Sequence, residues 1–351
     1  MISQNQIRLL LMLWFESNAR VLPWRETKNP YFIWISEIML QQTRVEAVIE
    51  YYSKFITRLP TIFDLANVED DELYKLWQGL GYYSRAKNLK KAAGIVIEQF
   101  SGVMPNRKEE LIKLPGIGPY TAGAIASIAF DERTPAIDGN VMRVISRLYG
   151  STLDITTKVA KQEIEALVVD LLPTKEIGKF NQALMELGAT VCIPNGKPKC
   201  RQCPLNEWCS ASINQTTNEI PVKSKKKDRV IEPRTVLLTK VGSNWLIRKR
   251  PSKGLLANLW EFPNLIGKPS IMELKRFLLE HHIEVASIAK SEDAKHIFSH
   301  IEWHMETYLV EGRLLEDLDN GFLLTSEIEL NDQYSVPAAF SHCLRIINNL
   351  K

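Results

Sequence analysis

The chain has 351 residues, of which 45% are hydrophobic and 24% are charged, and its formal net charge is +3. This length favours two domains over one compact core. The composition excludes a disordered, collagen-like or membrane-embedded chain. Because acidic and basic residues nearly balance, any affinity for a polyanion must come from local clusters of lysine and arginine.

The five cysteines are distributed unevenly: four lie between residues 192 and 209, and Cys343 stands alone. One close cluster is typical of a metal or cofactor site rather than of a disulfide framework, and we expect Cys343 to be a small buried apolar residue. The sequence shows neither a run of about 18 apolar residues nor a signal-peptide pattern. These features predict a cytoplasmic protein that does not bind a membrane.

From residue 5 to about 212, apolar residues recur every three or four positions, which is the period of a helix with one buried face. Proline and glycine interrupt this pattern at 59–60, 79–81, 104–106 and 172–174, where turns would connect helices. We therefore predict an all-α N-terminal part with about ten helices.

Residues 221–233 lack an apolar period and lie between two prolines. The segment carries the basic residues Lys223, Lys225, Lys226, Lys227 and Arg229. We interpret it as a solvated linker between a domain at 1–220 and a domain at 234–351. In the second domain, β-branched runs at 235–239, 245–248 and 307–310 predict strands and residues 270–281 predict a helix, so its fold class is α+β.

The cysteine cluster consists of Cys192, Cys200, Cys203 and Cys209. Four thiolates on one loop can converge on a single inorganic centre, either structural zinc or an iron–sulfur cluster, and spacing alone leaves both open. The neighbouring Lys197, Lys199 and Arg201 make the loop basic. The centre would therefore stiffen a loop that contacts DNA without any redox chemistry.

A second motif spans residues 114–124, where Gly116 and Gly118 flank one apolar residue just before a helix rich in small residues. The free N–H groups of such a helix start can bind a phosphate and so fix the register on a duplex. Taken alone, the same glycine turn is more often plain helix capping.

Together with residues 137–141, these two motifs resemble the endonuclease III superfamily of base-excision glycosylases. The motifs at 22–25, 36–43, 80–85 and 298–300 resemble its MutY-type adenine DNA glycosylases. The resemblance implies an all-α helix-hairpin-helix core, a [4Fe–4S] cluster and a Nudix-like C-terminal domain. The expected partner is double-stranded DNA with adenine opposite 8-oxoguanine, bound by a monomer. This chain has seven residues between Cys192 and Cys200, where the family usually has six.

Two carboxylates in contrasting environments suit hydrolysis of an adenine glycosidic bond. Glu37 lies on an apolar helix, where desolvation would raise its pKa and keep it protonated as the acid for the base. Asp138 stands at a helix N-cap, where N–H groups would favour the ionised form that stabilises the sugar cation or bonds to it transiently. The alternatives without catalysis are a solvent-facing Glu37 and an Asp138 that only caps its helix.

Further roles follow from the resemblance alone. Tyr120 and Asn140 match active-site positions of the family whose side chains orient other groups by hydrogen bonds. Tyr120 also stands where relatives that cleave the DNA backbone have a lysine, so lyase activity is not expected. The residues matched to base and DNA contacts are Trp24 and Arg25 in the adenine pocket, and Gln42 and Tyr82 as wedges with Leu40 and Thr43 beside them.

The C-terminal domain resembles a Nudix fold at residues 254–263, but residues 275–281 lack the glutamate array that holds magnesium. We therefore expect it to bind and not to hydrolyse, with Ser299 contacting 8-oxoguanine. The competing functions are an endonuclease III-like glycosylase and lyase, a non-catalytic iron–sulfur DNA-binding damage sensor and, least favoured, a Nudix hydrolase.

Overall fold

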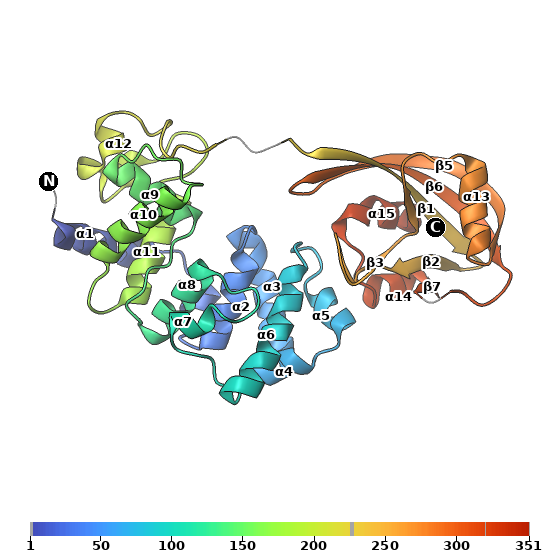
Figure 1. Ribbon diagram of the computed structural model, residues 1–351, viewed down its shortest axis with the longest axis horizontal. Helices are drawn as coiled ribbons and strands as arrows, with labels where there is room; N and C mark the ends of the chain where they lie inside the picture. Colours follow the sequence, from blue (N-terminus) through green and yellow to red (C-terminus); the bar gives the residue numbers. More distant parts are fainter. Residues whose placement is uncertain (1–2, 225–227, 320, 351) are drawn as a thin grey trace. The chain divides into compact units, whose positions relative to one another are not determined.

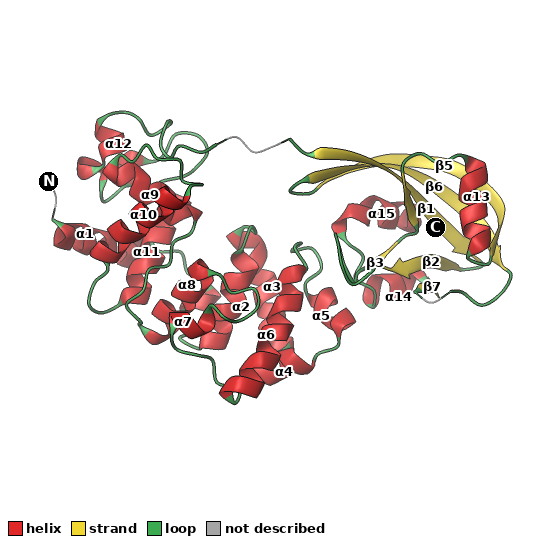
Figure 2. Cartoon of the chain, viewed as in Figure 1, coloured by secondary structure: helices red, strands yellow, loops and turns green. Residues whose placement is uncertain are grey.

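The computed structural model describes residues 3–224, 228–319 and 321–350, so Lys225, Lys226 and Lys227 of the predicted linker lie outside the described residues. The chain forms two compact units. The helical unit comprises residues 1–67 and 87–225, and the sheet unit comprises residues 68–86 and 226–351. Figures 1 and 2 show the elements of each.

The helical unit contains α-helices and short 3-10 helices, in agreement with the helical period of its apolar residues. Its elements are α1 (Gln4–Asn18), η1 (Pro23–Arg25), α2 (Pro30–Leu40), α3 (Val45–Arg58), α4 (Ile62–Asn67), most of α6 (Ser84–Phe100), α7 (Lys108–Leu111), α8 (Pro119–Phe130), α9 (Gly139–Tyr149), α10 (Lys158–Leu171), α11 (Ile177–Thr190), η2 (Cys200–Gln202), η3 (Asn206–Trp208) and α12 (Ser210–Ile213). One apolar core joins the inner faces of α1, α9, α10 and α11.

Two glycines let α11 approach the helices that carry the site. A Cβ atom on Gly178 would lie 2.5 Å from Cα of Ile128 in α8, and one on Gly188 would lie 2.6 Å from Cβ of Asn140 in α9. Larger side chains at either position would force these helices apart, because interiors are close-packed. Glycine therefore fixes how α11 sits against the residues around the pocket.

The sheet unit has a mixed sheet with helices on both faces, which confirms the predicted α+β class. Its elements are α5 (Asp70–Leu76), β1 (Val230–Val241), β2 (Asn244–Lys249), β3 (Trp260–Glu261), β4 (Asn264–Ile266), α13 (Ile271–Glu280), β5 (Ile283–Ile297), β6 (Ile301–Leu314), β7 (Phe322–Thr325), α14 (Glu327–Asp332), η4 (Ala338–Phe340) and α15 (Ser341–Asn349). Within the described residues the seven strands form one sheet of order β3-β2-β1-β6-β5, with β4 on β1 and β7 on β2.

Among the described strands of this sheet, only β1 and β6 run parallel. One apolar cluster fills the face covered by α15, where Cys343 is fully buried as expected, and a second fills the face covered by α13. The loop that joins β5 to β6 carries residues 298–300 at the end of a long hairpin. Figure 1 shows α13 and α15 on opposite sides of the strands.

Two boundaries differ from the prediction. Strand β1 begins at Val230, inside the predicted linker, because backbone pairing with Ile301 of β6 needs no apolar period. Residues 68–86 fold with the sheet unit, where Asp71 accepts hydrogen bonds from Lys249 Nζ at 3.1 Å and Trp260 Nε1 at 3.2 Å. Contacts between residues so far apart in sequence leave no local pattern. Among the described helices, none has the length and apolar character needed to cross a bilayer.

Candidate active site

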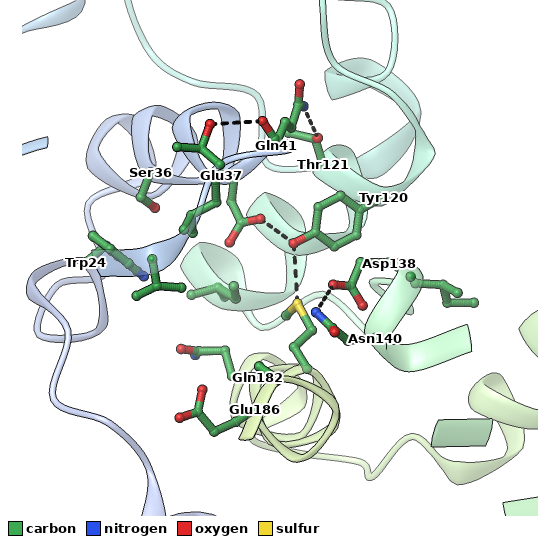
Figure 3. Close-up of a pocket in the computed structure, with 18 of the residues that line it drawn as sticks. Trp24, Ser36, Glu37, Gln41, Tyr120, Thr121, Asp138, Asn140, Gln182 and Glu186 are labelled. Atoms are coloured by element: carbon green, nitrogen blue, oxygen red, sulfur yellow. Dashed lines mark hydrogen bonds between the residues drawn. The ribbon is translucent and has the colours of Figure 1, made fainter. Parts of the chain in front are cut away.

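A cavity of about 860 Å³ opens in the helical unit between α2, α8, α11 and the start of α9. Figure 3 shows its lining residues. It brings together the predicted residues Trp24, Arg25, Glu37, Leu40, Gln42, Thr43, Gly116, Gly118, Tyr120, Asp138 and Asn140. These residues are spread over more than a hundred positions, so their meeting in one pocket is a property of the fold.

Glu37 is buried on α2, with 5% of its surface exposed, so the alternative of a solvent-facing side chain is wrong. The Tyr120 hydroxyl donates a hydrogen bond to Glu37 Oε2 at 2.6 Å. The pKa of Glu37 is raised to about 7: burial has the largest effect and raises it, the Tyr120 hydrogen bond lowers it, Asp138 raises it and Arg25 lowers it. The predicted rise is confirmed, and a carboxyl with this pKa exchanges its proton near neutral pH.

Asp138 caps α9 as predicted. Its Oδ1 accepts from the Val141 N–H at 2.8 Å, and its Oδ2 accepts from Asn140 Nδ2 at 2.7 Å. We expected the helix N–H groups to favour the ionised form, and their hydrogen bonds do lower the pKa of Asp138, but burial is the largest influence and raises the pKa above its ordinary value. The hydrogen bonds and Arg143 lower the pKa and only partly offset the burial.

A side-chain hydrogen bond and a glycine turn border the pocket next to Tyr120. Gln41 Nε2, at the end of α2, donates to Thr121 Oγ1 on α8 at 3.2 Å, next to Tyr120. Gly116 has a φ of 80°, and Gly118 is the N-cap of α8 with no side-chain capping bond, which leaves N–H groups of this helix start free of a side-chain cap. The glycine turn therefore has the backbone that phosphate binding requires.

Helix α11 contributes residues that sequence reasoning missed. Gln182, Met185, Glu186 and Ala189 line the pocket from one face of this helix. Burial alone would raise the pKa of Glu186, but hydrogen bonds from Arg20 Nε and Arg25 Nη2, each at 2.7 Å, bring it to about 2. The four lining residues of α11 recur at spacings of three and four positions in the sequence. This helical spacing was the only sequence signal for them, and it does not distinguish residues that line a pocket from residues of an apolar core.

The other matched residues also have defined surroundings. Trp24 is buried against Tyr52, with ring centroids 5.4 Å apart, so it both packs and lines the pocket. Gln42 and Tyr82, the two matched wedges, have positive φ values of 58° and 49°. Tyr82 and Ser299 belong to the sheet unit, where their exposed hydroxyls are 3.0 Å apart and form a hydrogen bond.

Cys192, Cys200, Cys203 and Cys209 line one small cavity of about 30 Å³. Four thiolates on one zinc ion would lie about 4 Å apart, because Zn–S bonds are about 2.3 Å long. In the part of the chain that is described, no group of three or more His, Cys, Asp or Glu side chains is placed to hold a metal ion. Four thiols that line one cavity could hold either a zinc ion or an iron–sulfur cluster.

One hydrogen-bond path joins this cysteine loop to the pocket. Arg143 donates from Nη2 to Asn140 Oδ1 at 2.7 Å and from Nε to the Cys192 carbonyl at 2.7 Å. Asn140 in turn donates to Asp138. The cysteine loop therefore contributes to the placement of the carboxylate.

Comparison with known proteins agrees with this geometry. Residues 35–169 match the HhH-GPD superfamily base excision DNA repair protein, and residues 234–345 match the NUDIX domain. The adenine DNA glycosylase of Buchnera aphidicola subsp. Schizaphis graminum is 37% identical over 313 residues, which is 89% of each chain. The chain belongs to the adenine DNA glycosylase family. It is therefore a DNA glycosylase of base-excision repair, and the fold and family inferred from its motifs are confirmed.

More distant relatives share the same architecture. The Homo sapiens adenine DNA glycosylase is 36% identical over 366 residues, covering 87% of this chain and 66% of its own. Among solved structures, a thermostable thymine-DNA glycosylase has a TM-score of 0.56 at 30% identity, covering 60% of this chain and 97% of its own. A non-covalent endonuclease III–DNA complex has a TM-score of 0.52 at 26% identity, covering 62% and 99%.

Proposed function

We propose that this glycosylase hydrolyses the N-glycosidic bond of adenine mispaired with 8-oxoguanine or guanine in duplex DNA, that it acts as a monomer, and that it lacks lyase activity. The observation that carries the proposal is the pocket in which Glu37, hydrogen-bonded to Tyr120, faces the same space as half-buried Asp138 (Figure 3). Adenine departs as a neutral base only if it gains a proton while the sugar bears positive charge.

Glu37 supplies the proton. With a pKa of about 7 it is substantially protonated at neutral pH, and Tyr120 orients its carboxyl through the 2.6 Å hydrogen bond. Asp138 supplies the opposing negative charge, and its ionised form is stabilised by Val141 and Asn140. The two groups therefore act on the two ends of the bond that breaks.

Tyr120 also restricts the reaction to removal of the base, without a lyase step. A glycosylase that is also a lyase attacks the sugar with an amine and forms a Schiff base, and a phenol cannot do this. Burial raises the pKa of the Tyr120 hydroxyl well above its ordinary value, so it remains a neutral donor. The product is therefore an abasic site in an intact strand.

The remaining residues bind the DNA. Trp24 and Arg25 line the part of the pocket that takes the extruded adenine, and Gly116 and Gly118 bind the backbone phosphate. Extrusion leaves a gap in the stack that costs a few kcal/mol. Gln42 and Tyr82 fill this gap, with Leu40 and Thr43 beside them, while Ser299 contacts 8-oxoguanine.

Cys192, Cys200, Cys203 and Cys209 would hold a [4Fe–4S] cluster. When bound, it would fix the loop that presents Lys197, Lys199 and Arg201 to the DNA backbone. Visible absorption of the purified protein tests this part, because iron–sulfur clusters absorb there and zinc does not.

The test of the activity uses a duplex with one adenine opposite 8-oxoguanine and a label on each strand. We expect hot alkali to break the adenine strand alone, and borohydride to trap no protein adduct. The matched control is Glu37→Gln, which keeps the size of the side chain and cannot donate as an acid. An adenine strand that survives alkali, or one that breaks without it, would contradict the proposal.

A further inference from the structure

The turn between α5 and α6 holds Tyr82 in an unusual backbone conformation. Tyr82 has a φ of 49°, which residues with a side chain adopt at a cost, and 47% of its surface is exposed. Gly79 and Gly81 also have positive φ values, of 103° and 71°, and glycine takes them easily. A turn with a strained aromatic residue needs contacts that fix its backbone.

Arg85 makes such contacts from the first turn of α6. Its Nη2 donates to the carbonyl oxygens of Leu80 and Gly81, each at 3.0 Å. The indole N–H of Trp77 donates to the same Gly81 carbonyl at 3.1 Å. The two peptide groups that precede Tyr82 are therefore tied to a helix that is itself part of the fold.

The guanidinium also lies between two rings. Its central carbon is 5.2 Å from the centroid of the Trp77 ring and 5.7 Å from that of the Tyr82 ring, within cation–π range. Arg85 is 7% exposed, and burial lowers its pKa to about 10, which still leaves it charged at neutral pH. A charge is costly to bury, so simple packing at this place would favour an apolar side chain.

We propose that Arg85 is a positioning residue that holds Tyr82 ready to enter the DNA stack beside the partner base. The proposal rests on the wedge role proposed for Tyr82. Arg85 touches neither the adenine nor the reacting atoms; it acts by fixing the backbone before Tyr82 and the angle of its ring. A wedge that is ordered before binding loses less conformational entropy when it inserts.

Two substitutions of Arg85 distinguish the effect of its charge from the effect of its side-chain length. Arg85→Met keeps much of the length and removes both the charge and the donors, so we expect single-turnover adenine release from the 8-oxoguanine mispair to fall about tenfold or more. Arg85→Lys recovers part of the rate, because one nitrogen makes both carbonyl contacts and an ammonium can replace it. Arg313→Met, an exposed arginine in the same unit paired with Glu284, is the matched control and should keep the wild-type rate.

A double-mutant cycle with Tyr82→Ala tests whether Arg85 acts through the wedge. We expect Arg85→Met to add no further loss in the Tyr82→Ala background. A fluorescent 2-aminopurine beside the 8-oxoguanine, in a duplex whose adenosine is a hydrolysis-resistant 2′-fluoro analogue, reports unstacking on binding. Its signal should drop in Arg85→Met and Tyr82→Ala alike, whereas a general loss of folding would instead lower the midpoint of thermal unfolding.

The outcomes are distinguishable. The positioning role of Arg85 is overturned if Arg85→Met and Tyr82→Ala lower the rate of adenine release independently, so that the two losses multiply in the double variant. It is also overturned if Arg85→Met keeps the wild-type rate and 2-aminopurine signal. A wild-type rate and signal in Tyr82→Ala overturns the wedge and the Arg85 proposal together, while adenine release by the wild type still supports the glycosylase function. Failure of the wild type to release adenine refutes the proposed function itself, and the 2-aminopurine signal then decides the Arg85 proposal alone.

Discussion

At the scale of single residues, the raised pKa of Glu37 makes the folded state less stable at high pH. The folded pKa of Glu37 is about 7 against an ordinary 4.5, so the folded state binds this proton more tightly than the unfolded chain does. Stability is therefore lost as the pH rises from 4.5 through 7. We predict that Glu37→Gln is more stable than the wild type at pH 8 by up to about 3 kcal/mol, with little difference at pH 5. Urea unfolding at both pH values measures this, and an equal difference at both would argue against the raised pKa.

Glu186 has the opposite pKa shift and the opposite consequence. Its folded pKa of about 2 lies below the ordinary 4.5, so its contribution is present above pH 4.5 and is lost as the pH falls through 2. Glu186→Gln removes the buried carboxylate that Arg20 and Arg25 share, and we predict a loss of about 2–4 kcal/mol at pH 7. Chemical denaturation provides the measurement, and a variant as stable as the wild type would show that the pairing contributes nothing.

At the scale of elements, the packing of α11 against α9 controls the placement of Asn140. A Cβ at position 188 would lie 2.6 Å from Cβ of Asn140, so Gly188→Ala must move the residue that donates to Asp138. We predict a fall of about tenfold or more in single-turnover adenine release, with a destabilisation of about 1–3 kcal/mol from overpacking.

Gly178→Ala is the matched control for this effect. It overpacks the same helix against Ile128 and Ser127 at the opposite end of α8 from Tyr120. We expect a similar loss of stability and a smaller loss of rate. Equal losses of rate in the two variants would mean that Gly188→Ala acts through general destabilisation and not through Asn140.

At the scale of the whole molecule, the residues proposed for the chemistry and those proposed for lesion reading belong to different units. The two carboxyls lie in the helical unit, whereas Ser299 and Tyr82 lie in the sheet unit. We predict that Ser299→Ala lowers the rate on adenine opposite 8-oxoguanine about tenfold, as loss of one hydrogen bond would, and leaves the rate opposite guanine nearly unchanged. Parallel single-turnover assays on both mispairs give the ratio, and an equal loss on both would remove Ser299 from lesion recognition.

The parts of the account that followed from sequence are those with a local pattern. The apolar period gave the helices, and the motifs around Glu37, Tyr120 and Asp138 placed these residues at one site. The role of Glu186 and the attachment of residues 68–86 to the sheet unit were not predictable, because each depends on contacts between distant segments. The rise in the pKa of Asp138 was not predictable for the same reason: the cap is visible in the sequence, and the burial that outweighs it is not.

The pH dependence of single-turnover adenine release tests the central claim most directly, because it reports the protonation of Glu37 and Asp138 during the reaction. We predict that the wild-type rate falls as the pH rises through about 7, where Glu37 loses its proton, and also falls at low pH, where Asp138 gains one. Glu37→Gln should be slow and should lack the fall near pH 7. A wild-type rate that stays constant from pH 6 to pH 9, or a Glu37→Gln variant that keeps the wild-type profile, would contradict it.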